Sequence, residues 1–163
     1  MFPLSDKRED TYIAGLSMGG YGALRNGIVY SETFSHIAGL SSAVHLFDKD
    51  AQHIGGENTI FGDIDKAVLT NVNPKVAFDE LIAEKRKMPK FYMSCGTEDD
   101  LITAGKDLRD YLISKGADVT WDEEKGGHDW DFWDSQIKKV LEWLPLDNDI
   151  NGLGSGNVKI GDD

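Results

Sequence analysis

The chain has 163 residues, of which 40% are hydrophobic and 28% are charged, a composition typical of one globular domain with its own core. The formal net charge of −12 argues against a nucleic-acid partner, because phosphate binding requires a basic surface. There is a single cysteine, no signal peptide and no apolar run of the ~18 residues that span a membrane, so the sequence predicts a cytoplasmic protein without internal disulfides.

Strands and helices are expected to alternate along the chain. Short apolar runs predict strands, whereas apolar residues at helical spacing predict helices that end near Gly or Pro. In chain order the sequence predicts strand 11–14, helix 18–29, strand 36–40, helix 64–72 closed by Asn73 and Pro74, helix 75–87, strand 90–94, helix 104–115, strand 119–122 and helix 130–144. This alternation predicts an α/β fold whose mostly parallel sheet carries helices on both faces.

The first strand and helix are joined by Gly15-Leu16-Ser17-Met18-Gly19, which matches the nucleophile-elbow pattern G-x-S-x-G. In such an elbow the serine sits in a sharp turn, and glycines two residues away on either side avoid a collision of side chains. The turn also directs the Met18 N–H toward a carbonyl under attack, as half of an oxyanion hole. A glycine-rich turn with an idle serine is the simpler alternative, but the position between a predicted strand and helix favours a nucleophile.

A serine hydroxyl needs a base and an orienting carboxylate before it can attack. Among the four histidines, His128 lies in a glycine-rich loop between the last strand and the last helix, whereas His36 begins a strand and is expected to be structural. The acids at 98–100 follow the strand at 90–94, and spacing alone does not distinguish among the three. They could instead cap the next helix. The order serine, acid, histidine is that of α/β-hydrolases.

Three segments, IAGLSMGGYGALR, FYMSCGTEDDL and GGHDWDFWDSQI, resemble the esterase D family of α/β-hydrolases, especially its bacterial tributyrin-esterase-like branch. The resemblance extends over about residues 2–155. It implies that Ser17 is the nucleophile, that Asp99 rather than its two acidic neighbours is the acid, that His128 is the base and that the Met18 N–H binds the oxyanion.

Members of this family carry further strands ahead of the elbow, together with a His-Gly loop that supplies the second oxyanion donor. Here the elbow begins at residue 15, so the chain resembles the C-terminal portion of a longer hydrolase. We therefore expect strand 11–14 to form an open sheet edge. Either a second copy of the chain, in a homo-oligomer, or a separate N-terminal chain is expected to cover it.

We divide the chain into an α/β-hydrolase catalytic domain at 1–145, with a cap-like insertion at 41–88, and a polar C-terminal tail at 146–163. His45 and Phe47 lie just after a predicted strand and are expected to line the substrate pocket.

The last helix carries an apolar stripe that is expected to face the core, with Trp130 and Trp133 as its anchors. The stripe consists of Trp130, Trp133, Ile137, Val140, Leu141 and Leu144. Beyond this helix, the stretch 147–152 begins like a calcium loop, but Val158 stands where a Glu ligand is needed. No metal site is therefore expected.

These features lead to the hypothesis of a serine carboxylesterase that hydrolyses short-chain acyl or acetyl esters through an acyl-enzyme. A small ester is the expected substrate, with neither cofactor nor metal required. Acyl transfer to an acceptor other than water would use the same residues. A catalytically inactive fragment that serves as an interaction module is the alternative from a different class.

Overall fold

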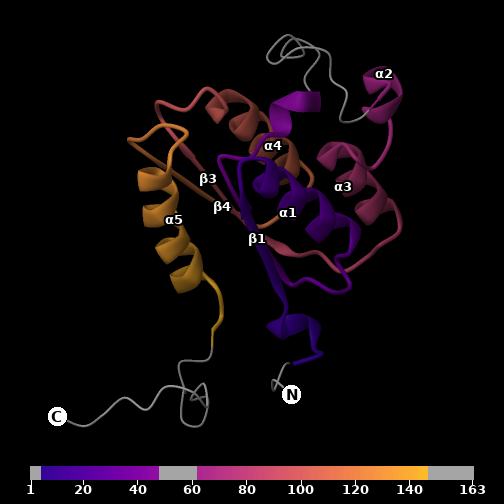
Figure 1. Ribbon diagram of the computed structural model, residues 1–163. Helices are drawn as coiled ribbons and strands as arrows, with labels where there is room; N and C mark the ends of the chain where they lie inside the picture. The colour runs from indigo at the N-terminus through magenta and orange to yellow at the C-terminus, as the bar shows by residue number, and fades with distance from the viewer. Residues whose placement is uncertain (1–4, 48–61, 147–163) are drawn as a thin grey trace, which may run out of the picture.

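The computed structural model describes residues 5–47 and 62–146 (Figure 1). The calcium-like stretch at 147–152 and nearly all of the predicted tail lie outside these ranges, as does the middle of the predicted insertion. The elements in chain order are η1 (Arg8–Asp10), β1 (Tyr12–Leu16), α1 (Met18–Val29), β2 (His36–Leu40), η2 (Val44–Phe47), α2 (Ile64–Ala67), α3 (Pro74–Ala83), β3 (Lys90–Gly96), α4 (Ile102–Ser114), β4 (Val119–Glu124) and α5 (Trp130–Trp143). None of the helices in the described ranges is long and apolar enough to cross a membrane.

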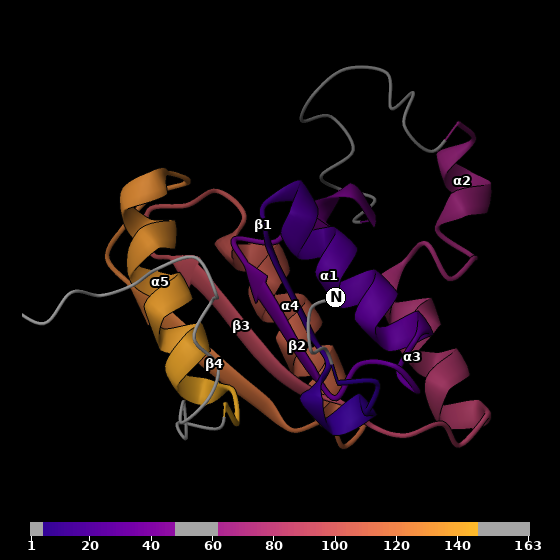
Figure 2. The same ribbon diagram turned by 60° about the horizontal axis from the view of Figure 1, so that its bottom comes forward.

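The four strands form one parallel sheet in the order β1-β2-β3-β4. Ile13, Ile37, Phe91 and Val119 lie opposite one another in a row across it. Their face packs against α1, α3 and α4 around buried residues such as Phe78 (Figure 2). Parallel strands need helical crossovers, which bury the sheet. The predicted α/β fold is confirmed.

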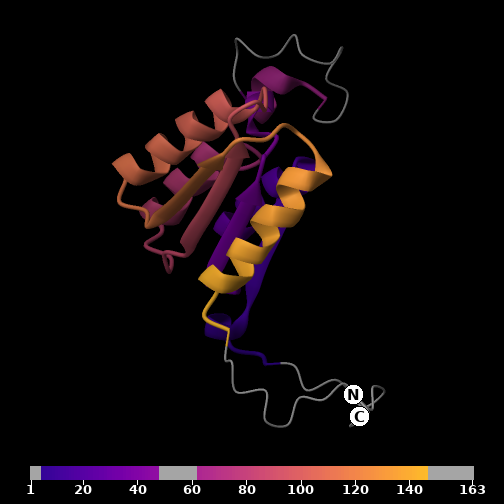
Figure 3. The same cartoon turned by 90° about the vertical axis from the view of Figure 1, so that its left-hand side faces the viewer.

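The opposite face of the sheet is covered by α5 (Figure 3). A second core cluster forms here from β2, β3 and α5, and its buried members are Ala38, Leu40, Tyr92, Phe132, Trp133 and Val140. Because this layer contains a single long helix, α5 alone shields the sheet on this side within the described residues. The two layers together bury the central strands β2 and β3.

The buried face of α5 differs from the predicted stripe. Trp130 is 72% exposed, so the prediction that it anchors the helix in the core is wrong. Ile137 and Leu141 of the stripe are exposed as well, whereas Trp133 and Val140 are buried as predicted. Gln136 is fully buried. The polar Gln136 is tolerated because its amide accepts a hydrogen bond from the Tyr92 hydroxyl and donates one to Glu124. The spacing of apolar residues alone therefore did not predict correctly which face of α5 packs against the sheet.

A second correction concerns Asn73 and Pro74, which were expected to close a helix at 64–72. They begin α3 instead: the Asn73 side chain accepts a hydrogen bond from the Lys75 N–H, and Pro74 is the first helical residue. Asparagine at the N-cap and proline in the first turn are helix-start signals. Helix α2 ends earlier, at Ala67.

Candidate active site

Ser17 lies between β1 and α1 in a backbone conformation that few residues with a side chain adopt. Its φ is 54° and its ψ is −121°. A Cβ atom on Gly15 would lie 2.2 Å from the carbonyl oxygen of Gly19, so the turn requires glycine at position 15. The Ser17 N–H donates to the carbonyl of Leu40 at 2.8 Å, which ties the turn to the end of β2. This is the geometry that the elbow pattern predicts, except that the expected collision at Gly19 is wrong: a Cβ atom there would meet no described atom within 4 Å outside its own helix backbone.

Two hydrogen bonds connect three of the predicted site residues. Ser17 Oγ lies 2.8 Å from His128 Nε2, and His128 Nδ1 lies 2.9 Å from Asp99 Oδ2. The three residues follow β1, β4 and β3 respectively. The carboxyl ends of parallel strands meet at one edge of a sheet, which is why residues 111 positions apart in sequence are in contact.

Asp99 is the acid that reaches His128. Its side chain is 1% exposed, and its second oxygen accepts a hydrogen bond from the Leu101 N–H at 2.9 Å. Burial raises the pKa of Asp99, but the hydrogen bonds from Leu101 and His128 outweigh it and hold the pKa below its ordinary value. The buried Ser41 hydroxyl, which makes no hydrogen bond of ordinary geometry with any described residue, faces the same carboxyl and also lowers its pKa.

The neighbouring acids point elsewhere. Glu98 is 60% exposed, with Lys125 3.9 Å away, and Asp100 is exposed to solvent. Both border the cavity beside Ser17, but His128 forms its carboxylate hydrogen bond with Asp99. The geometry therefore separates three acids that spacing left equivalent.

Met18 is the first residue of α1, where a backbone N–H has no acceptor within the helix. The N–H is thus available as the oxyanion donor that the elbow pattern assigns to this position. The Met18 side chain is 44% exposed and borders the same cavity as Ser17.

His45 lies in the wall of this cavity, which has a volume of about 570 Å³. The cavity is lined by Ser17, Met18, Ala43, His45, Leu46, Glu98, Asp99, Asp100, Leu101 and His128. His45 Nδ1 is buried without a hydrogen-bond partner among the described residues. Burial, and then the proximity of His128, lowers the pKa of His45, which favours its neutral form.

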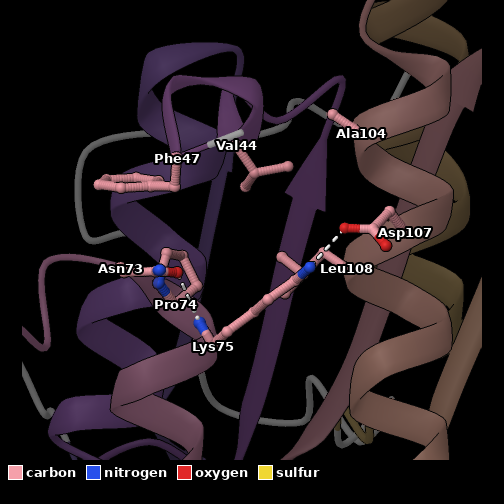
Figure 4. Close-up of a pocket in the computed structure, with 8 residues that line it drawn as sticks. All are labelled: Val44, Phe47, Asn73, Pro74, Lys75, Ala104, Asp107 and Leu108. Atoms are coloured by element: carbon pink, nitrogen blue, oxygen red, sulfur yellow. Dashed lines mark hydrogen bonds and ion pairs between the residues drawn. The ribbon is translucent and has the colours of Figure 1, made fainter. Parts of the chain in front are cut away.

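Phe47 lies apart from His45, although both were expected to line one pocket. Its ring borders a separate hollow of about 380 Å³ beneath η2, between α3 and α4 (Figure 4). There Phe47 packs against Tyr21, with ring centroids 5.4 Å apart, and an ion pair joins Lys75 to Asp107 across the hollow. A 3₁₀ turn has three residues per turn, so residues two positions apart, such as His45 and Phe47, lie on different sides of it.

Two residues near the site were not assigned to it from the sequence. Ser41 follows β2 with a φ of 43° and faces Asp99. Trp133, which was expected only in the core, contacts the ring of His128. The spacing of Trp133 from His128 is a local signal that could have indicated the contact, whereas nothing in the sequence near Ser41 indicates its neighbour.

In the part of the chain that the structure describes, no group of three His, Cys, Asp or Glu side chains is placed to hold a metal ion. The single cysteine, Cys95, is buried next to Asp99, and burial raises the pKa of its thiol to about 12. A thiol in this state is a poor nucleophile and a poor metal ligand at neutral pH.

Comparison with known proteins gives one family. Residues 2–144 match the family model described as "Esterase". An acetyl esterase of Caldicellulosiruptor saccharolyticus is 40% identical over an alignment of 153 residues, and the match covers 88% of this chain and 58% of that protein. The chain thus spans a little over half the length of this curated relative.

Solved structures show the same relationship. The S-formylglutathione hydrolase FrmB of Staphylococcus aureus is similar with a TM-score of 0.77 and 30% identity, over 88% of this chain and 57% of that one. FphF, a fluorophosphonate-binding serine hydrolase of the same species, is similar with a TM-score of 0.72 and 33% identity, over 90% of this chain and 58% of that one. The fold is therefore that of the α/β-hydrolase esterases.

Proposed function

Because this chain belongs to the Esterase family, we propose that it is a serine carboxylesterase that hydrolyses short-chain acyl or acetyl esters through an acyl-enzyme. The observation that carries the proposal is the pair of hydrogen bonds, 2.8 Å and 2.9 Å, that runs from Ser17 through His128 to Asp99. The name of the acetyl esterase relative supports the choice of a small acyl group.

In the proposed reaction, His128 Nε2 accepts the proton of Ser17 Oγ as the oxygen attacks the ester carbonyl. The Met18 N–H donates to the oxyanion of the tetrahedral intermediate. His128 then protonates the departing alcohol, which leaves an acyl group on Ser17. Water, deprotonated by the same imidazole, releases the acid. Asp99 accepts a hydrogen bond from Nδ1–H throughout, and so keeps Nε2 free to take the proton.

A fluorophosphonate probe tests this directly, because it phosphonylates only a serine that a base has activated. The native chain is expected to carry one label, located on Ser17 by mass spectrometry of the peptides. Heat-denatured protein, in which the hydrogen bonds from Ser17 to His128 and from His128 to Asp99 are broken, provides the control and should remain unlabelled. A folded chain that does not react would contradict the proposal and favour the inactive interaction module.

We also propose that the open edge of β1 is covered in the active enzyme, by a second copy of the chain or by a separate chain that adds a strand. Within the described residues β1 pairs only with β2, and Ala14 in its middle is exposed. Unpaired N–H and C=O groups along an edge favour strand addition. Each such group, if buried without a partner, costs about 1–3 kcal/mol.

The chain purified alone is therefore expected to self-associate. Size-exclusion chromatography with light scattering, at several protein concentrations, measures this. The expected result is a mass that rises above the 18.0 kDa of one chain as the concentration increases. A stable monomer with full esterase activity over the whole range would show that the edge needs no cover.

A further inference from the structure

Two hydrogen bonds hold the imidazole of His128, one from Nδ1 to Asp99 and one between Nε2 and Ser17 Oγ. Its side chain is 36% exposed, and it follows two glycines, Gly126 and Gly127, in the loop before α5. In the proposed reaction the bond to Asp99 persists, whereas the one at Nε2 is lost when Ser17 gives up its proton and bonds to the ester carbon. At that step the hydrogen bond to Asp99 alone does not fix the ring plane. Proton transfer requires the ring plane to be fixed as well, so that Nε2 faces Ser17 Oγ.

Trp133 supplies a contact that can fix the ring plane. Its indole stands edge-to-face with the imidazole of His128, with ring centroids 4.9 Å apart and an angle of 88° between the planes. Aromatic pairs favour this edge-to-face geometry over a face-to-face sandwich, so the contact opposes rotation of the imidazole out of this orientation. Trp133 does not line the cavity beside Ser17, so it acts on the imidazole and not on the substrate.

The indole is itself held firmly. Trp133 is 8% exposed and packs in the second core cluster with Phe132 and Val140 of α5 and with the sheet. The first turn of α5 links it to the loop: the Asp129 side chain accepts a hydrogen bond from the Phe132 N–H, and the Asp129 carbonyl accepts one from the Trp133 N–H. Side chains on a helix lean toward its N-terminus, which here is the direction of His128.

A packing role alone does not account for a tryptophan at this position. The Trp133 Nε1–H is buried and has no hydrogen-bond partner among the described residues. A buried donor without an acceptor destabilises the folded state, and a phenylalanine would fill part of the same space without this cost. The broad indole occupies this position although its polar group has no partner among the described residues.

We propose that Trp133 is a positioning residue for His128, which fixes the plane of the imidazole for proton transfer. The inference rests on the proposed function, in which His128 is the base. Loss of the indole should lower kcat, because the proton is transferred from a poorly oriented ring. It should leave KM nearly unchanged, because the cavity walls stay in place.

Trp143 provides a matched control on the same helix. It packs against the same core cluster and stands edge-to-face with another histidine, His36, with centroids 5.0 Å apart and planes at 77°. His36 is not the histidine that contacts Ser17 and Asp99. Trp143→Leu therefore removes an indole and an aromatic–histidine contact without touching His128.

The experiment compares Trp133→Leu, Trp133→Phe and Trp143→Leu in the hydrolysis of p-nitrophenyl acetate. We expect Trp133→Leu to lower kcat by about tenfold or more with KM within about twofold, since small misplacements of a catalytic group have effects of this size. Trp133→Phe, which keeps an aromatic ring but a narrower one, should recover only part of kcat. Trp143→Leu should lower the melting temperature but leave kcat near the wild-type value.

A second readout does not depend on turnover. Nuclear magnetic resonance of the histidine ring nitrogens should show the His128 Nδ1–H as a sharp signal in the wild type and in Trp143→Leu, and as a broadened one in Trp133→Leu. Equal losses of kcat in the two leucine variants, or a sharp His128 signal in Trp133→Leu, would overturn the positioning role. An inactive wild type with a sharp His128 signal that broadens in Trp133→Leu would instead count against the esterase function alone.

Discussion

Ser17→Ala is expected to abolish hydrolysis of p-nitrophenyl acetate apart from a small residual rate. Without Oγ no acyl-enzyme forms, and His128 loses the group from which it takes a proton. Removal of the nucleophile from a serine hydrolase of this type lowers kcat by a factor on the order of 10⁶, and the remainder comes from substrate binding and the oxyanion donor. The measurement is kcat under saturating ester, together with fluorophosphonate labelling.

Ser35→Ala is the matched control for this experiment. Ser35 Oγ lies 2.8 Å from His36 Nδ1, the same distance as in the Ser17–His128 pair. The Ser35–His36 pair, however, is at the start of β2, whereas the elbow contacts the carbonyl of Leu40 at its end. Loss of the Ser35 hydroxyl should reduce stability by about 1 kcal/mol and leave kcat unchanged. Retention of wild-type kcat by Ser17→Ala would rule out the serine mechanism.

Asp99→Asn is expected to lower kcat by about 10⁴-fold, the effect of the equivalent change in a well-studied serine protease triad. The asparagine amide can donate a hydrogen bond to Nδ1, which then places the imidazole proton on Nε2. In that tautomer His128 has no lone pair facing Ser17 Oγ. The effect should be in kcat, with KM little altered, because Asp99 is buried behind the imidazole.

Glu98→Gln and Asp100→Asn serve as controls, because each removes one charge beside the same cavity. Both side chains are exposed, and neither forms the hydrogen bond to His128. Their kcat values should stay within a few-fold of the wild type. If Asp100→Asn proves to be the damaging change, the assignment of the acid is off by one residue.

The Asp99 carboxyl group also makes the free energy of unfolding depend on pH. The folded protein holds the pKa of Asp99 below its ordinary value, so the carboxylate stabilises the fold fully at any pH above that ordinary value. This contribution is lost only in acid, as the pH falls through the lowered pKa. Asp99→Asn should therefore flatten the acid limb of the stability curve, as measured by denaturant unfolding.

The features that the sequence by itself determined are those whose cause is local. The elbow could be predicted because strand, turn and helix are encoded within eighteen residues, and because Gly15 is required by its contact with Gly19 four residues away. His128 could be predicted from its glycine-rich loop between two clear elements. The parallel α/β fold could be predicted because strands and helices differ in the spacing of their apolar residues. Short continuous apolar runs alternate along the chain with segments whose apolar residues have helical spacing.

The start of α3 is also encoded locally, although its residues were expected to end a helix. Asn73 and Pro74 form an N-cap and a first-turn proline, yet a proline also commonly follows the end of a helix. The structure decides between the two meanings because α3 has a face to bury, with Phe78 and Leu81 in the core. Asn73 and Pro74 are consistent with a helix end or a helix start until the surface against which α3 packs is known.

Tertiary structure alone decided the rest, because those features depend on contacts between segments far apart in the chain. Spacing did not distinguish the acids at 98–100, although the family resemblance implied Asp99. The carboxyl that contacts His128 is that of Asp99 because β3 and β4 lie side by side in a register that brings this carboxyl, and neither neighbour, to His128. Trp130 is exposed and Gln136 buried because Tyr92 of β3 and Glu124 of β4 satisfy the glutamine amide. The 3₁₀ turn places His45 and Phe47 on different sides of η2, and the contact of η2 with α4 decides that His45 borders the cavity beside Ser17 while Phe47 borders the hollow between α3 and α4. Burial and hydrogen bonding across the sheet are properties of pairs of segments, and one segment's sequence does not specify its partner.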